Sequence, residues 1–94
     1  MGMNEEIRIT GRLICPRDEL DAVRAGLAEH VRLSRAEPGC LAFEIAEDPN
    51  EPGVFHVAET FRDAAAFEAH RARAAASDWA AISRNVTRDL KGLP

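Results

Sequence analysis

Residues 40–61 read CLAFEIAEDPNEPGVFHVAETF, two apolar stretches separated by a cluster of turn-forming residues. Alternate residues of the first stretch share one face of an expected strand: Leu41, Phe43 and Ile45. Alternate residues of the second stretch do the same: Phe55, Val57, Glu59 and Phe61. The run DPNEPG over residues 48–53 is dense in residues that favour turns. We therefore predict a β-hairpin with strands over residues 40–47 and 54–61.

The sequence before the hairpin predicts one strand and one helix. Residues 7–14 alternate as a strand does, and Pro16 ends it. Asp18 is a suitable N-cap for a helix that ends near Ala36, since Pro38 and Gly39 cannot continue it. The apolar stripe of this helix consists of Leu20, Val23, Leu27, Val31 and Ser34.

The sequence after the hairpin predicts two helices and a short strand. Asp63 can cap the first helix, Ser77 and Asp78 can begin the second, and residues 87–93 can form the strand. Trp79, Ile82 and Val86 follow helical spacing in the second helix. The resulting order is strand–helix–strand–strand–helix–helix–strand, which is that of the ferredoxin-like split β-α-β plan. We expect an α+β fold with an antiparallel four-stranded sheet and its helices on one face.

Length and composition limit the chain to one domain over residues 1–94, with residues 1–5 expected to form a loose tail. Apolar residues make up 46% of the chain, but 17 of them are alanines, so the core of a single copy is thin. Few charges occur on either face of the expected strands. We therefore expect the uncovered sheet face to be buried against a second copy, in a homodimer.

Several functional classes are disfavoured by the same composition. No apolar run approaches the ~20 residues of a membrane span, and the acidic start of the chain does not resemble a signal peptide. The net charge of −4 argues against nucleic-acid binding. Cys15 and Cys40 lack zinc-site spacing and are expected to be reduced thiols in a cytoplasmic protein.

A family resemblance is carried by four segments in order. They are SRAEPGCLAFE at residues 34–44, Asp48-Pro49, FHVAETF at residues 55–61 and AFEAH at residues 66–70. Over about residues 7–86 the chain resembles the antibiotic biosynthesis monooxygenase (ABM) domain. The resemblance implies the dimeric α+β barrel, in which two ferredoxin-like sheets pack face to face.

The resemblance also implies an activity. Members include oxygenases of quinols and polycyclic phenols that use neither metal nor flavin, and haem-degrading enzymes. We therefore expect a cofactor-independent monooxygenase for a small quinol or phenolic compound, because the anion of such a substrate can itself pass an electron to dioxygen. A non-catalytic small-molecule binding or sensing module and a haem-binding or haem-degrading protein are the alternatives. The haem-degrading branch uses an Asn in its first strand, and residues 7–14 contain none.

Glu59 and His70 are the expected catalytic residues. Glu59 is a carboxylate among apolar residues of its strand face, and His70 lies one turn from Phe67 on the apolar side of its helix. Both match positions where the family carries Glu and His, and either could accept a phenolic proton. The structural alternative is that they bond to each other or to the backbone and hold helix to strand.

Four aromatic side chains are the expected lining of a substrate pocket, with plain core packing as the alternative: Phe43, Phe61, Phe67 and Trp79. His30 lies beside the stripe of the first helix and is expected at its boundary, and His56 is expected at an interface or edge. Metal binding is disfavoured because strand alternation points His56 and Glu59 to opposite faces. The chain has no tyrosine, so a mechanism that needs a pocket tyrosine cannot operate. Ala58 and Phe61 stand where many relatives carry Tyr and Trp.

Overall fold

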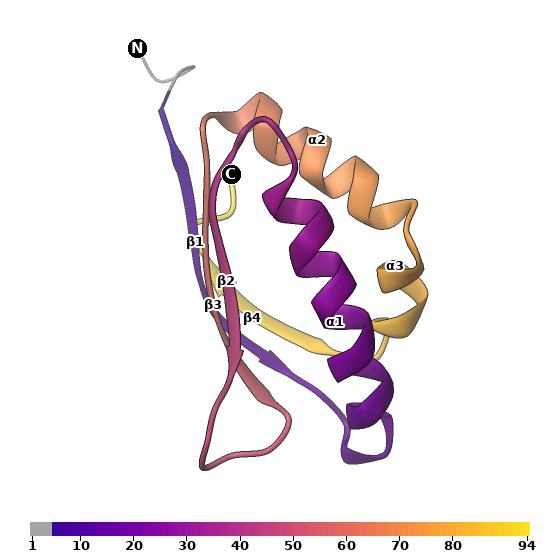
Figure 1. Ribbon diagram of the computed structural model, residues 1–94. Coiled ribbons are helices and arrows are strands. Elements are labelled where there is room, and N and C mark those ends of the chain that lie inside the picture. Colours follow the sequence, from indigo (N-terminus) through magenta and orange to yellow (C-terminus); the bar gives the residue numbers. More distant parts are fainter. Residues whose placement is uncertain (1–4) are drawn as a thin grey trace.

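The sheet is built around the predicted hairpin. The computed structural model describes residues 5–94, so the tail expected over residues 1–5 falls almost wholly outside it (Figure 1). Strands β2 (Cys40–Glu47) and β3 (Val54–Phe61) pair antiparallel, β1 (Ile7–Ile14) adds to β3, and β4 (Thr87–Lys91) adds to β1. The order β2-β3-β1-β4 confirms the ferredoxin-like α+β prediction.

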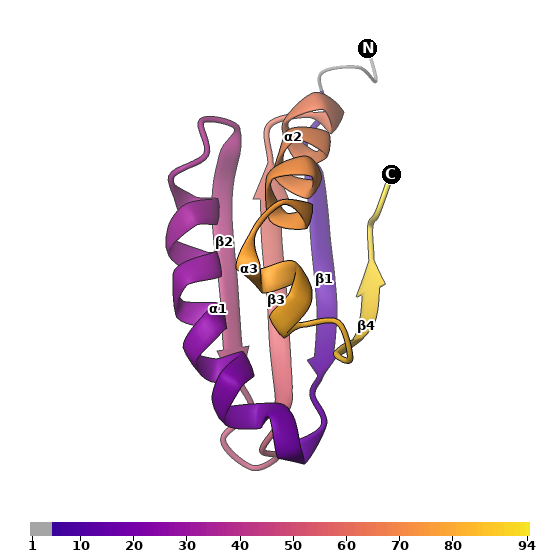
Figure 2. The same ribbon diagram turned by 90° about the vertical axis from the view of Figure 1, so that its right-hand side faces the viewer.

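Three helices cover one face of this sheet (Figure 2), and the edge-on view shows that the other face is uncovered (Figure 1). They are α1 (Leu20–Arg35), α2 (Ala64–Ala75) and α3 (Asp78–Ile82). None of the helices within residues 5–94 has the length and apolar character required to cross a membrane.

The helix ends agree with the sequence in part. The Asp63 carboxylate accepts a 2.8 Å hydrogen bond from the backbone N–H of Ala66, so Asp63 caps α2 as predicted. Asp18 is not the cap of α1, because it lies within a 3-10 turn (Arg17–Glu19) that precedes the helix. Helix α3 ends at Ile82, so Val86 is not part of it, contrary to the prediction. Val86 lies in the segment between α3 and β4 and is buried there.

Most of the bulky apolar side chains of the sheet face the helices, with Ile14 and Leu41 as exposed exceptions, and this overturns one expectation. Phe43 and Phe61 are at most 1% exposed on this side. Leu41 does not share their face, because the register shift between Cys40 and Ala42 interrupts the alternation and leaves Leu41 53% exposed. The expected bare apolar face is therefore not present.

The uncovered face of the sheet carries small and charged side chains instead. Arg12 on β1 pairs with Asp89 on β4 at 3.2 Å, and the exposed His56 places Nε2 2.8 Å from Asp48. Gly11 brings β1 and β4 close, since its φ is +141° and a Cβ there would collide with the backbone oxygen of Asp89. This face therefore has little apolar surface that a second copy of the chain would need to cover.

Candidate functional site

A cavity of about 440 Å³ lies between the helix-facing side of the sheet and the helices. Its apolar walls come from both layers: Ile9, Leu13, Ile45, Phe67 and Trp79. This volume is in the range of pockets that bind small molecules. We therefore ask which of the predicted site residues line this cavity.

Glu59 lines this cavity from β3. Its side chain faces the helices because it shares strand parity with Val57 and Phe61, which are both buried. It makes no hydrogen bond or ion pair with another residue of the segment 5–94. Burial, with a smaller contribution from the charge of Glu37, raises the pKa of Glu59 to about 7. Its carboxyl group can therefore exchange a proton near neutral pH.

His70 lines the same cavity from α2, and it is bound to Glu37. Its Nδ1 lies 3.0 Å from Oε1 of Glu37 and 3.3 Å from Oε2. Burial lowers the pKa of His70 and outweighs the opposing effect of Glu37. The contact is thus a hydrogen bond from a neutral ring, in which Nδ1–H donates and Nε2 keeps its lone pair.

Glu59 and His70 reach the cavity separately. Neither bonds to the other among the contacts of residues 5–94, and Glu37, in the turn that follows α1, is the partner of His70 instead. The bond ties α2 to α1 and not to β3. A structural role for His70 therefore concerns the packing of the two helices.

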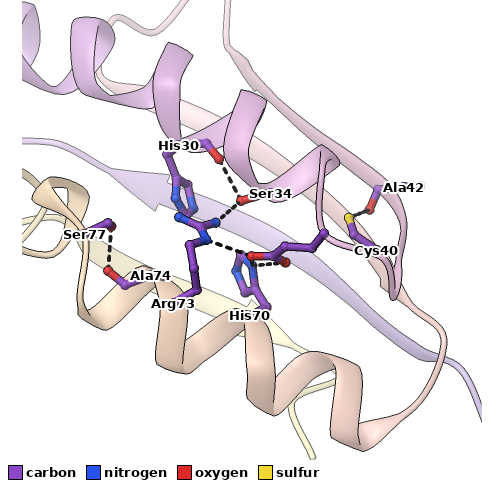
Figure 3. A network of polar contacts seen from close by, with 9 residues as sticks. His30, Ser34, Cys40, Ala42, His70, Arg73, Ala74 and Ser77 are labelled. Carbon is purple, nitrogen blue, oxygen red and sulfur yellow. Dashed lines mark hydrogen bonds and ion pairs between the residues drawn. The ribbon is translucent and has the colours of Figure 1, made fainter.

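Arg73 extends the contact into a network (Figure 3). Its Nε donates to Oε2 of Glu37 at 2.9 Å, and its Nη2 donates to the hydroxyl of Ser34 at 2.8 Å. That hydroxyl donates in turn to the backbone oxygen of His30 at 2.7 Å. The network holds Glu37, and through it the ring of His70, in one orientation.

His30 is the site residue that sequence reasoning missed. It is 6% exposed, lines the cavity, and stacks on Trp79 with ring centroids 4.9 Å apart and planes at 10°. The expectation of a boundary position is wrong, because α1 turns His30 inward in place of the half-buried Val31. The spacing Val23, Leu27, His30 and Ser34 is also one helical stripe, and it was the available signal.

The four predicted aromatic residues divide into two pairs. Phe67 and Trp79 line the cavity. Phe43 and Phe61 are not among its lining residues and lie in the adjacent core, where the Phe61 ring is 4.8 Å from that of His70. The predicted catalytic residues and half of the predicted aromatic residues therefore surround one space.

Comparison with known proteins identifies the family. The family model described as antibiotic biosynthesis monooxygenase matches residues 7–82. The chain belongs to this family. A search of curated proteins found no match.

Solved structures of family members share the fold of this ABM protein. A candidate antibiotic biosynthesis monooxygenase of Bacteroides thetaiotaomicron has a TM-score of 0.81 at 23% identity, over 96% of this chain and 87% of its own. A second candidate, from Deinococcus radiodurans, has a TM-score of 0.74 at 27% identity, over 93% and 86%. These similarities establish the ferredoxin-like fold, and family membership indicates a monooxygenase-like function in general terms.

Two arginines give the cavity of this ABM protein a positive character. Arg71 on α2 lies 5.8 Å above the centre of the Phe67 ring, and Arg88 on β4 donates to the hydroxyl of Ser83 at 2.8 Å. Both line the cavity, where they favour a ligand that carries negative charge. Within residues 5–94, no group of three or more His, Cys, Asp or Glu side chains has an arrangement able to hold a metal ion.

Proposed function

We propose that this protein is a cofactor-independent monooxygenase for a small quinol or phenolic compound, in which Glu59 and His70 accept protons from the substrate. The observation that carries the proposal is the convergence of both groups on one partly apolar cavity of about 440 Å³. The cavity suits a fused aromatic ring, and Arg71 and Arg88 favour the anion that deprotonation produces.

The chemistry requires no external reductant. Loss of the phenolic proton to Glu59 or His70 makes the ring electron-rich enough to transfer an electron to dioxygen. A carbon–oxygen bond then forms and the oxygen–oxygen bond breaks. One oxygen atom becomes a ring carbonyl and the other leaves as water, so that a phenol and O₂ give a quinone and H₂O. All four electrons that reduce dioxygen come from the substrate.

The proposal includes a homodimer joined through the uncovered sheet faces, in the cytoplasm. The small, exposed side chains of Ala42 and Ala58 support close approach of a second sheet. Light scattering tests the oligomer directly, and a monomer at micromolar concentration would remove this part of the proposal.

The activity is tested by oxygen uptake and by incorporation of ¹⁸O from ¹⁸O₂, with a panel of hydroquinones, naphthols and naphthoquinols. We expect Glu59→Gln or His70→Ala to lower turnover about 100-fold, the usual contribution of a positioned general base. The control is Glu68→Gln, which removes an exposed carboxylate of α2 away from the cavity lining. Full turnover in both site variants would refute their assignment. Binding without oxygen uptake above background would favour the small-molecule binding module.

A further inference from the structure

His30 and His70 meet at the cavity from two different helices. Their ring centroids are 5.6 Å apart, and each residue is at most 7% exposed. Both residues line the cavity, so a molecule inside it lies next to their rings. What each ring offers to a ligand depends on which of its nitrogens carries the hydrogen.

The tautomer of His70 follows from its bond to Glu37. A carboxylate accepts hydrogen bonds, so Nδ1 of His70 donates at 3.0 Å. Nε2 of the neutral ring then has no hydrogen and makes no bond within residues 5–94. Nε2 therefore has a free lone pair, and His70 lines the cavity. Glu37 acts as a positioning residue for this nitrogen.

The opposite tautomer of His30 follows from Arg73. Among the described residues, only two buried side-chain nitrogen or oxygen atoms lack a hydrogen-bond partner: Nδ1 of His30 and Nη1 of Arg73. Figure 3 draws the guanidinium of Arg73 next to the ring of His30, and its charge is close enough to help lower the pKa of that ring. A guanidinium only donates, so its presence disfavours an N–H at Nδ1, and we infer that Nδ1 keeps its lone pair and Nε2 carries the hydrogen.

His30 stays neutral in this environment. Burial is the main cause that lowers its pKa to about 3, and the positive charges of Arg73 and Arg88 lower it further. Its ring is fixed between Trp79, on which it stacks, and Phe43, whose ring it meets edge-on at 5.5 Å. A neutral, rigid donor suits a developing oxygen anion without bringing a charge of its own.

We propose that His30 and His70 form a donor–acceptor pair that binds one hydroxyl group of the substrate. Nε2–H of His30 donates to the hydroxyl oxygen, and Nε2 of His70 accepts the hydroxyl hydrogen. In the reaction the O–H bond breaks and an N–H bond forms on His70, while His30 stabilises the phenolate oxygen. The Glu37 carboxylate stabilises the resulting imidazolium, so Glu37 and Arg73 are positioning residues. The inference rests on the proposed function for its substrate class and adds the group by which that substrate is recognised.

The tautomers are tested without any ligand. Nitrogen-15 NMR of labelled imidazoles distinguishes a ring protonated on Nδ1 from one protonated on Nε2. We expect Nε2–H in His30 and Nδ1–H in His70 at neutral pH. The opposite assignment for either ring would overturn the proposal.

Binding is tested anaerobically with 1-naphthol and 1-methoxynaphthalene, which differ in that the ether cannot donate. The indole N–H of Trp79 reports occupancy, because it is the only tryptophan in the chain and lines the cavity. We expect naphthol to bind about tenfold more tightly, the effect of one or two neutral hydrogen bonds. This preference should fall to about threefold or less in His70→Phe. His30→Phe should instead weaken the binding of both ligands, because the oxygen of each can accept from Nε2–H of His30, and unchanged binding of both would refute the donor. His30→Gln should weaken both less, because the amide can donate.

The matched control is Ile45→Val, which alters an apolar part of the same wall and should preserve the preference. If His30→Phe does not fold, the pair is still tested by His30→Gln and by the binding of the two ligands to the unaltered protein. Equal binding of naphthol and its ether to the unaltered protein would refute the pair, even if oxygen uptake is observed. Absence of oxygen uptake with the preference intact would refute only the proposed function.

Discussion

Replacing Glu59 by Gln tests the physical basis of the site through stability. The folded protein binds the Glu59 proton with a pKa of about 7, against an ordinary value of 4.5. Between these two pH values the folded state keeps a proton that the unfolded chain has lost, so the free energy of unfolding falls as the pH rises through this window. Each pH unit corresponds to about 1.4 kcal/mol, so the ionised carboxyl costs about 3 kcal/mol above pH 7.

The side-chain amide of glutamine has no charge to desolvate, so Glu59→Gln should stabilise the protein relative to the unaltered chain at pH 8. We expect this gain to exceed the gain at pH 4.5 by about 3 kcal/mol. Urea unfolding at both pH values and at one protein concentration measures it. Glu68→Gln, on the exposed side of α2, is the control and should show a far smaller difference. A Glu59→Gln effect that is the same at both pH values would refute the argument that burial opposes ionisation of Glu59.

Two further predictions concern the frame of the site. Asp63→Ala removes the cap of α2, the helix that carries His70, and should lower the free energy of unfolding by about 1 kcal/mol. Asp63→Asn should lower it less, because the amide oxygen can still accept the capping hydrogen bond. Equal losses for the two variants in chemical denaturation would show that the cap is not the cause. Gly11→Ala should force β4 away from β1, because its Cβ would collide with the backbone oxygen of Asp89, and should cost about 2 kcal/mol. Hydrogen exchange should then be faster at the amides of β4 while Thr10→Ala leaves it unchanged, and unaltered protection in Gly11→Ala would contradict the close approach.

The fold was largely predictable because its signals are local. Alternation predicted the bounds of β2 and β3 as the structure has them, and the residues after Phe61 predicted the cap at Asp63. The errors arose where local signals compete. Asp18 has the chemistry of a cap but lies in a 3-10 turn, and a register shift displaces Leu41 from the face that strict alternation assigns to it.

The site was predictable only in the residues that stand out in their own segment. Glu59 is a carboxylate between apolar neighbours, and His70 is on the apolar side of its helix, so both could be chosen from the sequence. His30 could have been found from the stripe that it shares with Leu27 and Ser34. Glu37 carries no such signal, because it follows the end of α1 and meets His70 33 positions later in the chain.

The sequence by itself determined the strands, the helices and the α+β class, because alternation and helical stripes act over a few residues. The tertiary structure decided what those elements bring together. It directed most of the bulky side chains of the sheet toward the helices and left mainly small and charged ones on the other face. It also joined Glu37, His70 and Arg73 beside the cavity and turned His30 into it. The protonation state of each group depends on burial and on neighbours from other segments, so only the folded chain could set it.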